Sequence, residues 1–333
     1  MVTGISGQLA RSLAVQAKDQ AEIVLVGRPD LDLENPATFA PILKSVAPDM
    51  VINAAAHTGV DQQEDEPDRA FRINAEAPAE LARLTRLAGI PIVQVSTDYV
   101  FDGTSTRPYV ETDKANPQTV YGRSKLAGEE AVRAGNPDHM VVRTAWVVSR
   151  YGRNFVKTML SLAATRDRLQ VVSDQFGNPT DAHDLADGLL VAAGVWRRQG
   201  GFPQGLYHLA GQGKASRYEL ASHIFAISAS LGGPSAAVEP VSSNQWPAKA
   251  ARPANSELNS DAFFRDFGYR AGEWKKRIEG LGKVVSHTAC QRRLTYGCCS
   301  FCLGEFHVFR PSFRPFGNPA VRALVPCLQS QPA

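Results

Sequence analysis

The chain has 333 residues, of which 44% are hydrophobic and 21% charged, and its formal net charge is +3 at pH 7. This length suits one large α/β unit with a smaller lobe, and no apolar run approaches the ~18–20 residues that span a bilayer. Because residues 283–333 hold six Lys or Arg against one acid, the rest of the chain is slightly acidic, which argues against nucleic-acid binding. The N-terminus has no secretory signal pattern, so the expected compartment is the cytoplasm.

Short β-branched runs alternate with amphipathic stretches in the first half of the chain. This alternation is typical of βαβ units around a parallel sheet. The predicted strands are 22–26, 50–54, 92–96 and 139–143, and the predicted helices are 67–88 and 120–134. These elements indicate an α/β fold of the Rossmann type, with a doubly wound parallel sheet.

After Trp146 the pattern loosens, and we expect a smaller C-terminal substrate lobe. Helical spacing is retained at 155–164, 185–193 and 218–227, a short strand is predicted at 206–209, and 232–259 is predicted to form loops. The expected domains are a dinucleotide-binding domain at 1–150 and a substrate lobe mainly at 151–282, with some elements returning to the first domain. Residues 283–333 form an atypical tail.

All five cysteines lie in that tail. Cys299 and Cys302 have the spacing of half a zinc or redox site, but no second pair follows at a usable distance, so no metal is expected. Helical or strand periodicity ends after Gly282, and prolines and aromatic residues mix in 306–316. A frameshift in the coding sequence or a disordered segment would account for this change.

Two glycines, Gly4 and Gly7, precede an apolar helix start. Glycines at such a turn let the backbone approach a pyrophosphate, whose charge meets the free N–H groups of the helix. A strand of about five or six residues ordinarily precedes this motif, whereas only three residues precede Gly4, so either translation starts upstream or the strand is truncated. A glycine turn before any helix would look similar.

Arg28 follows the second predicted strand, at the position where NAD-specific folds commonly carry an acid. An arginine there can pair with a 2′-phosphate, which favours NADPH and leaves NADH possible. The alternative is that Arg28 is a solvated loop residue.

Tyr121 and Lys125 lie four residues apart on one face of the predicted helix 120–134. A phenol can protonate a developing alkoxide, and a neighbouring ammonium is expected to draw the pKa of the phenol towards neutrality. Thr97 follows the strand 92–96 at the edge where ligands bind in open α/β sheets. Although an isolated Tyr/Lys pair is usually a solvated face, the order of glycine turn, hydroxyl and Tyr/Lys pair favours a ketone reductase.

These motifs resemble those of the extended short-chain dehydrogenase/reductase family, in particular its dTDP-4-dehydrorhamnose reductases. The resemblance runs from Gly4 to about Asn259, with its most specific segments at 53–61, 96–103, 143–147, 174–180 and 252–256. It implies reduction of the 4-keto group of a nucleotide sugar, dTDP-4-dehydro-6-deoxy-L-mannose, to dTDP-L-rhamnose by NADPH or NADH.

The resemblance also implies roles for individual residues. Tyr121 is expected to donate the proton, Lys125 to support it electrostatically and Thr97 to tune the hydrogen bond. The motifs and the resemblance together give the residues that are expected to contact the cofactor: Gly4, Gly7, Gln8, Leu9, Arg28, Asp32, Leu33, Ala55, Ala56, Thr58, Tyr121 and Lys125. Substrate contacts are expected for Val60, Thr97, Asp98, Trp146, Arg252 and Asn255.

Ser12 and His183 occupy positions where some members carry magnesium-binding carboxylates, which again predicts no metal. Two other functions stay open. One is a non-catalytic NADP-binding regulatory subunit, since such a subunit is similar to this family. The other is a nucleotide-sugar epimerase or dehydratase, which keeps NAD through its catalytic cycle; a dehydratase needs an acid beside the hydroxyl residue, and Asp98 could be misread in that role. We expect a monomer or a homodimer.

Overall fold

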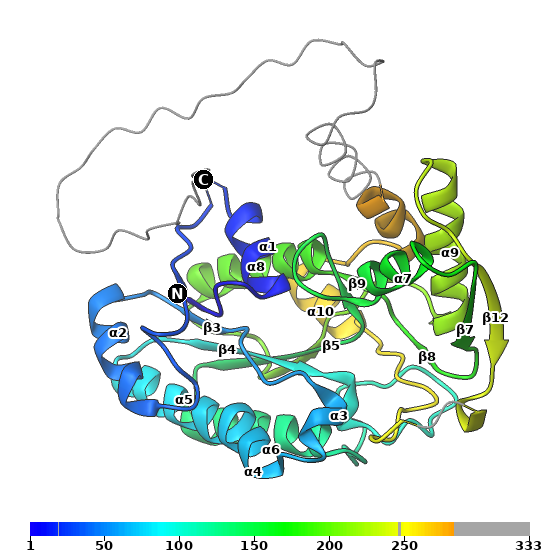
Figure 1. Cartoon of the computed structure of the whole chain (residues 1–333). Coiled ribbons are helices and arrows are strands. Elements are labelled where there is room, and N and C mark those ends of the chain that lie inside the picture. The colour runs from blue at the N-terminus through cyan, green and yellow to red at the C-terminus, as the bar shows by residue number, and fades with distance from the viewer. Residues whose placement is uncertain (19, 246–247, 283–333) are drawn as a thin grey trace, which may run out of the picture. The chain divides into compact units, whose positions relative to one another are not determined.

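A six-stranded parallel sheet in the order β10-β5-β4-β3-β1-β2 forms the centre of the fold (Figure 1). The structure is a computed structural model that describes residues 1–18, 20–245 and 248–282. Ile52 pairs with Val93, and Val93 pairs in turn with Met140, so that apolar side chains follow one another across the sheet. The strands are β1 (Val2–Thr3), β2 (Leu25–Val26), β3 (Val51–Asn53), β4 (Ile92–Thr97), β5 (His139–Thr144) and β10 (Leu206–His208).

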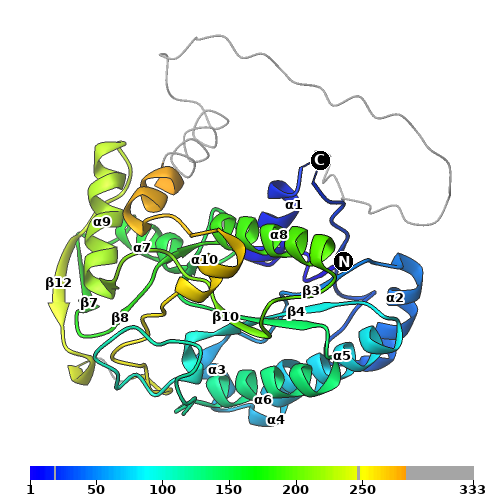
Figure 2. The same ribbon diagram turned by 180° about the vertical axis from the view of Figure 1, so that it is seen from behind.

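Helices cover both faces of this sheet (Figures 1 and 2). One face carries α1 (Gln8–Gln16), α8 (Ala182–Gln199) and α10 (Asp261–Phe267), which share a buried apolar core with the strands. The other face carries α2 (Phe39–Val46), α4 (Pro67–Phe71), α5 (Ala77–Leu87) and α6 (Val120–Gly135). The predicted doubly wound arrangement therefore forms, although the second strand is shorter than the predicted 22–26.

The predicted helix 67–88 is present but contains a π-helical turn at Arg72–Glu76, between α4 and α5. Inside this turn, the Asn74 side chain donates hydrogen bonds to the His57 carbonyl and to Ser124 Oγ in α6. A β-carbon at Gly128 of α6 would lie 2.1 Å from the Asn74 carbonyl oxygen. The glycine therefore lets α6 approach the π-helical turn closely.

Gly128→Ala is expected to destabilise the fold by about 1–3 kcal/mol, because the added methyl group would overlap a rigid backbone carbonyl. Gly194→Ala in α8 is the matched control, since its β-carbon would meet only the flexible end of Arg198 at 3.4 Å. Alanine is the better helix former by about 1 kcal/mol, so the control is expected to be neutral or stabilising. Urea unfolding measures both, and equal stability of the two variants would contradict the close contact.

The second lobe is built around a separate apolar core. Its main elements, which Figure 2 shows, are α7 (Phe155–Ala163), α9 (Arg217–Ser230), β7 (Arg168–Val172), β12 (Ala237–Val241) and a helix at 274–282. Smaller pairings join β6 (Val147–Val148) to β9 (Thr180–Asp181) and β8 (Phe176–Gly177) to β11 (Ala215–Ser216).

Strand β12 corrects the prediction that 232–259 consists of loops. It pairs in parallel with β7 over its whole length, even though it contains Pro240. A proline is tolerated on an edge strand, where its missing N–H costs no ladder hydrogen bond.

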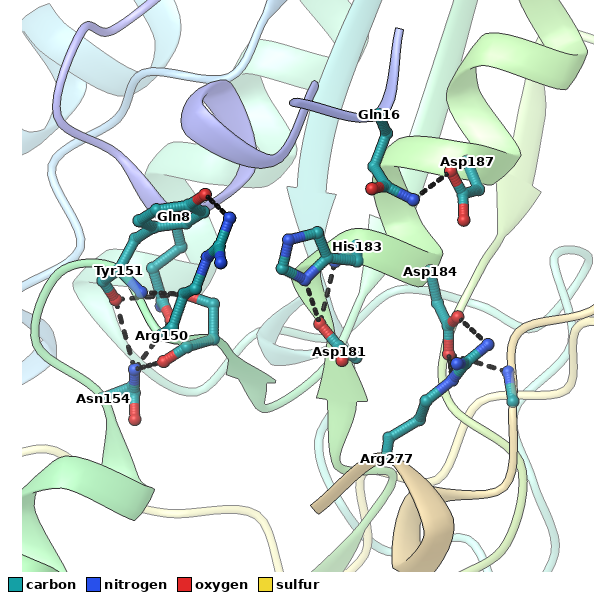
Figure 3. A network of polar contacts seen from close by, with 12 residues as sticks. Gln8, Gln16, Arg150, Tyr151, Asn154, Asp181, His183, Asp184, Asp187 and Arg277 are labelled. Carbon is teal, nitrogen blue, oxygen red and sulfur yellow. Dashed lines mark hydrogen bonds and ion pairs between the residues drawn. The ribbon is translucent and has the colours of Figure 1, made fainter. Parts of the chain in front are cut away.

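The C-terminal half returns to the first domain through α8, β10 and α10. A further link is the carboxylate of Asp184 in α8, which accepts hydrogen bonds from Arg277 Nε and the Gly272 backbone, both at 2.8 Å (Figure 3). The atypical tail 283–333, with its cysteine pair, lies outside the described residues. Among the residues described, no helix is both long enough and apolar enough to cross a membrane.

Candidate active site

A cavity of about 790 Å³ opens at the carboxyl ends of β1, β3 and β4. Ligands of open α/β sheets bind at this edge. The structure brings all the residues predicted to contact the cofactor to the wall of this cavity: Gly4, Gly7, Gln8, Leu9, Arg28, Asp32, Leu33, Ala55, Ala56, Thr58, Tyr121 and Lys125. Thr144, Gly152 and Arg153 also line it and were not predicted.

The glycine turn has the geometry of an anion cradle. Gly4 adopts φ +94°, which favours glycine, and a β-carbon there would lie 3.5 Å from that of Ala55. Gly7 is the N-cap of α1, and no side chain caps this helix end. The free N–H groups and the helix dipole are thus available to a pyrophosphate, so the residues present fit a dinucleotide cofactor.

The Gln8 side chain connects this turn to the loop after β6. Gln8 Oε1 accepts hydrogen bonds from Ser149 Oγ at 2.8 Å and Asn154 Nδ2 at 3.0 Å, and its Nε2 donates to the Val147 carbonyl at 3.3 Å. Figure 3 shows Gln8 beside Tyr151 and Asn154. Three hydrogen bonds of Gln8 therefore join the glycine turn to residues 147–154, which lie far away in the sequence.

Arg28 also lines the cavity, and its side chain is 69% exposed and 4.0 Å from the Glu34 carboxylate. Glu34 is held more closely by Arg69, with Nε and Oε1 3.0 Å apart. Arg28 is thus only weakly engaged within the protein, and its guanidinium is available to an anionic ligand.

Tyr121 enters the site because the first turn of α6 presses against the segment after β4. The Thr119 side chain caps α6 by accepting the Gly122 N–H at 3.0 Å, and a β-carbon at Gly122 would lie 2.1 Å from the Tyr99 carbonyl oxygen. Burial raises the pKa of Tyr121, while its hydrogen bond with Thr97 lowers it. This net rise corrects the expectation that Lys125 would draw the pKa of the phenol towards neutrality, since desolvation dominates.

Lys125 lies one helical turn further on and is buried. Its ammonium donates to the Val95 carbonyl at 2.6 Å, and burial lowers its pKa to about 8 although the charge of Glu129 raises it. Glu129 in turn pairs with buried Arg143 at 2.7 Å and accepts a hydrogen bond from Ser96 Oγ. A buried ion pair thus supports the strand next to Lys125.

The residues predicted to contact the substrate differ in their burial and in their hydrogen-bond partners. Thr97 and Asp98 are buried at the end of β4, with the Thr97 hydroxyl donating to Asp98 Oδ1 at 2.9 Å. Arg252 pairs with Asp61 at 2.6 Å, beside Val60 at the start of α3 (Val60–Gln63). The Asn255 side chain, by contrast, donates to the carbonyls of Ser105 and Arg107, so its amide N–H groups already have backbone partners.

Trp146 adopts φ +46°, and the guanidinium carbon of Arg217 lies 3.5 Å from its ring centroid. The sequence interpretation did not identify Arg217. The only local signal is the Ser216/Glu219 capping box, which places Arg217 in the first turn of α9 but does not reveal the contact with Trp146.

No group of three or more His, Cys, Asp or Glu side chains within 1–18, 20–245 and 248–282 is placed to hold a metal ion. Ser12 is fully buried, and its hydroxyl has no hydrogen-bond partner among the described residues.

Comparison with known proteins decides the family. Residues 1–286 match the family described as the RmlD substrate binding domain. The dTDP-4-dehydrorhamnose reductase of Sinorhizobium fredii is 43% identical over 281 residues, which cover 84% of this chain and 95% of the relative. The chain belongs to the dTDP-4-dehydrorhamnose reductase family.

Solved structures of dTDP-4-dehydrorhamnose reductases agree with this membership. The Clostridium acetobutylicum structure has a TM-score of 0.79 at 38% identity, covering 85% of this chain and 98% of that one. The Bacillus anthracis structure, a complex with NADP, has a TM-score of 0.77 at 33% identity, covering 84% and 96%. The predicted family and the Rossmann-type fold are thereby confirmed.

Proposed function

We propose that this protein reduces the 4-keto group of dTDP-4-dehydro-6-deoxy-L-mannose to the alcohol, giving dTDP-L-rhamnose, with NADPH or NADH as the reductant. The observation that carries the proposal is that Tyr121 and Lys125 line a cavity whose glycine turn fits a dinucleotide, with Thr97 next to Tyr121. Family membership and the NADP complex of a relative support the same reaction.

Bound NAD(P)H would supply the hydride that reaches the carbonyl carbon. The phenol of Tyr121 donates its proton to the carbonyl oxygen, and its raised pKa keeps that proton in place until the alkoxide develops. The Lys125 ammonium stabilises the phenolate that is left, and the Thr97 hydroxyl lies beside that of Tyr121. Residues at Val60, Asp98, Trp146 and Arg252 are proposed to surround the nucleotide sugar, which is the proposed partner.

The test of this function is to supply the 4-keto sugar nucleotide with NADPH or NADH, and to follow the loss of reduced cofactor and the appearance of dTDP-L-rhamnose. Protein that binds NADPH but never oxidises it with this sugar would instead be a non-catalytic NADP-binding subunit. Protein purified with tightly held NAD would be an epimerase or a dehydratase.

Arg28→Ala is expected to weaken NADPH binding by about tenfold and to leave NADH binding nearly unchanged, because only NADPH carries the 2′-phosphate that a guanidinium can grip. The side chain is exposed and weakly paired, so the fold should not suffer. Fluorescence titration with each cofactor measures the effect. An equal loss for both cofactors would contradict a role for Arg28 in selecting the phosphate.

A further inference from the structure

Arg217 is a cation in an unusual setting. Its guanidinium carbon lies 3.5 Å from the ring centroid of Trp146 and 5.2 Å from that of Phe155. Within the described part of the chain, no carboxylate forms an ion pair with it. A cation stacked on aromatic rings keeps its in-plane N–H donors free for another group.

The surroundings of Arg217 leave positive charge without a full counterpart. The pKa of Arg217 is lowered to about 10, mainly because burial desolvates the guanidinium; the charges of Tyr99 and Asp98 oppose this shift, and the charge of Arg252 adds to it. Arg252 has its own partner in Asp61. The two guanidinium groups are close enough for their charges to oppose each other, and Arg217 has no ion-pair partner among the residues that the structure describes, which is unfavourable unless an anion joins them.

The stack is also held firmly in place. A β-carbon at Gly177 would lie 2.7 Å from Trp146 Cε2 and 2.7 Å from Ser256 Oγ, so only glycine leaves room for the indole there. The Asp98 carboxylate, next to Thr97, lies close enough to Ser256 and Arg217 for both to lower its pKa, against the rise that burial causes. Arg217 thus belongs to a pre-formed wall that continues to the residues proposed to act on the ketone, and it keeps partial exposure.

We propose that Arg217 binds the diphosphate of the nucleotide sugar, with Arg252 as the second cation of that subsite. This inference rests on the proposed function. The diphosphate carries the negative charge of such a substrate, and a planar guanidinium can donate two parallel hydrogen bonds to phosphate oxygens. Binding there would give the free guanidinium its counter-ion, while Trp146 presents its indole to the neighbouring part of the ligand.

The experiment titrates dTDP and, separately, NADPH into the full chain and into Arg217→Gln and Arg217→Lys. Arg217→Gln is expected to weaken dTDP binding by about 10- to 100-fold, because it removes charge-assisted hydrogen bonds. Arg217→Lys keeps the positive charge but cannot donate two parallel hydrogen bonds, so its dTDP affinity should fall less. In turnover the loss should appear mainly in KM rather than in kcat.

Arg270→Gln is the control, since Arg270 also stacks on an aromatic ring, at 4.1 Å from the centroid of Phe264, but already has a carboxylate partner in Asp261 at 2.8 Å. It should change neither affinity. The inference is overturned by unchanged dTDP affinity in Arg217→Gln, by equal losses for Gln and Lys, or by a parallel fall in NADPH affinity and melting temperature.

The two proposals can fail separately. Wild-type turnover of the 4-keto sugar with an unaffected Arg217→Gln variant would overturn only the diphosphate subsite. A wild type that never reduces the sugar, yet binds dTDP in an Arg217-dependent way, would overturn only the proposed reaction.

Discussion

Tyr121→Phe is expected to lower kcat by about 10²–10⁴-fold, the usual contribution of a general acid, while NADPH affinity stays within about twofold. The phenol is half-buried beside Thr97, and desolvation raises its pKa, which keeps it protonated. Phenylalanine retains the ring and its edge-on contact with Tyr99, whose centroid lies 5.4 Å away, so the local packing should survive. The measurement pairs steady-state oxidation of NADPH with a cofactor titration on the same preparation.

Tyr207→Phe is the matched control for this substitution. Tyr207 is buried in β10, and its hydroxyl donates to Asp266 at 2.9 Å, far along the chain from the cavity residues. It should lose some stability but no activity. Full turnover by Tyr121→Phe would show that Tyr121 is not the proton donor. An equal loss of activity in both variants would show that the substitutions act by disturbing the packing.

Lys125→Met is expected to lower kcat/KM by about 100-fold or more at neutral pH, because the phenolate loses its stabilising cation. The pKa of Lys125 is lowered to about 8, so the wild-type profile should fall as pH rises above about 8. The methionine variant should lack this descending limb. A wild-type profile that stays flat to pH 10 would contradict a requirement for the ammonium.

The same lysine makes stability depend on pH. Its pKa is about 8 in the fold and 10.5 ordinarily, so between these values the unfolded chain binds more protons than the folded one. Cofactor-free wild type should therefore become more stable as pH rises from 8 to 10.5, as far as this group is concerned. Lys125→Met should lose that increment, which urea unfolding at several pH values would show.

Much of the fold follows from local sequence. The buried runs at 92–96 and 139–143 correspond to β4 and β5, because continuous β-branched residues suit strands covered on both faces. The interruption at Arg72–Glu76 could not be predicted, since the π-helical turn depends on the approach of Gly128 from another helix. Strand β12 was missed because Pro240 and its polar neighbours match a loop, whereas its pairing with β7 is a long-range contact.

In the candidate site, too, features set by local sequence were predictable, whereas features that depend on long-range contacts were not. The glycine turn and the Tyr121/Lys125 pair depend on spacing within one segment, and the sequence therefore predicts them. Arg217 is different, because its significance comes from a contact with Trp146 that only the folded second lobe creates. The hydrogen bonds that Asn255 donates to backbone carbonyls are likewise invisible in a sequence pattern.

The contact of Gln8 with the loop after β6 places a constraint on how this protein can diverge. Its carboxamide serves Ser149, Asn154 and the Val147 carbonyl at once, accepting from the first two and donating to the last. Glutamate would lose the donor and a shorter amide would lose the reach. A substitution at position 8 is therefore expected to require compensating changes at 149 and 154, although Gln8 begins α1 of the first domain and Asn154 caps α7 of the second lobe.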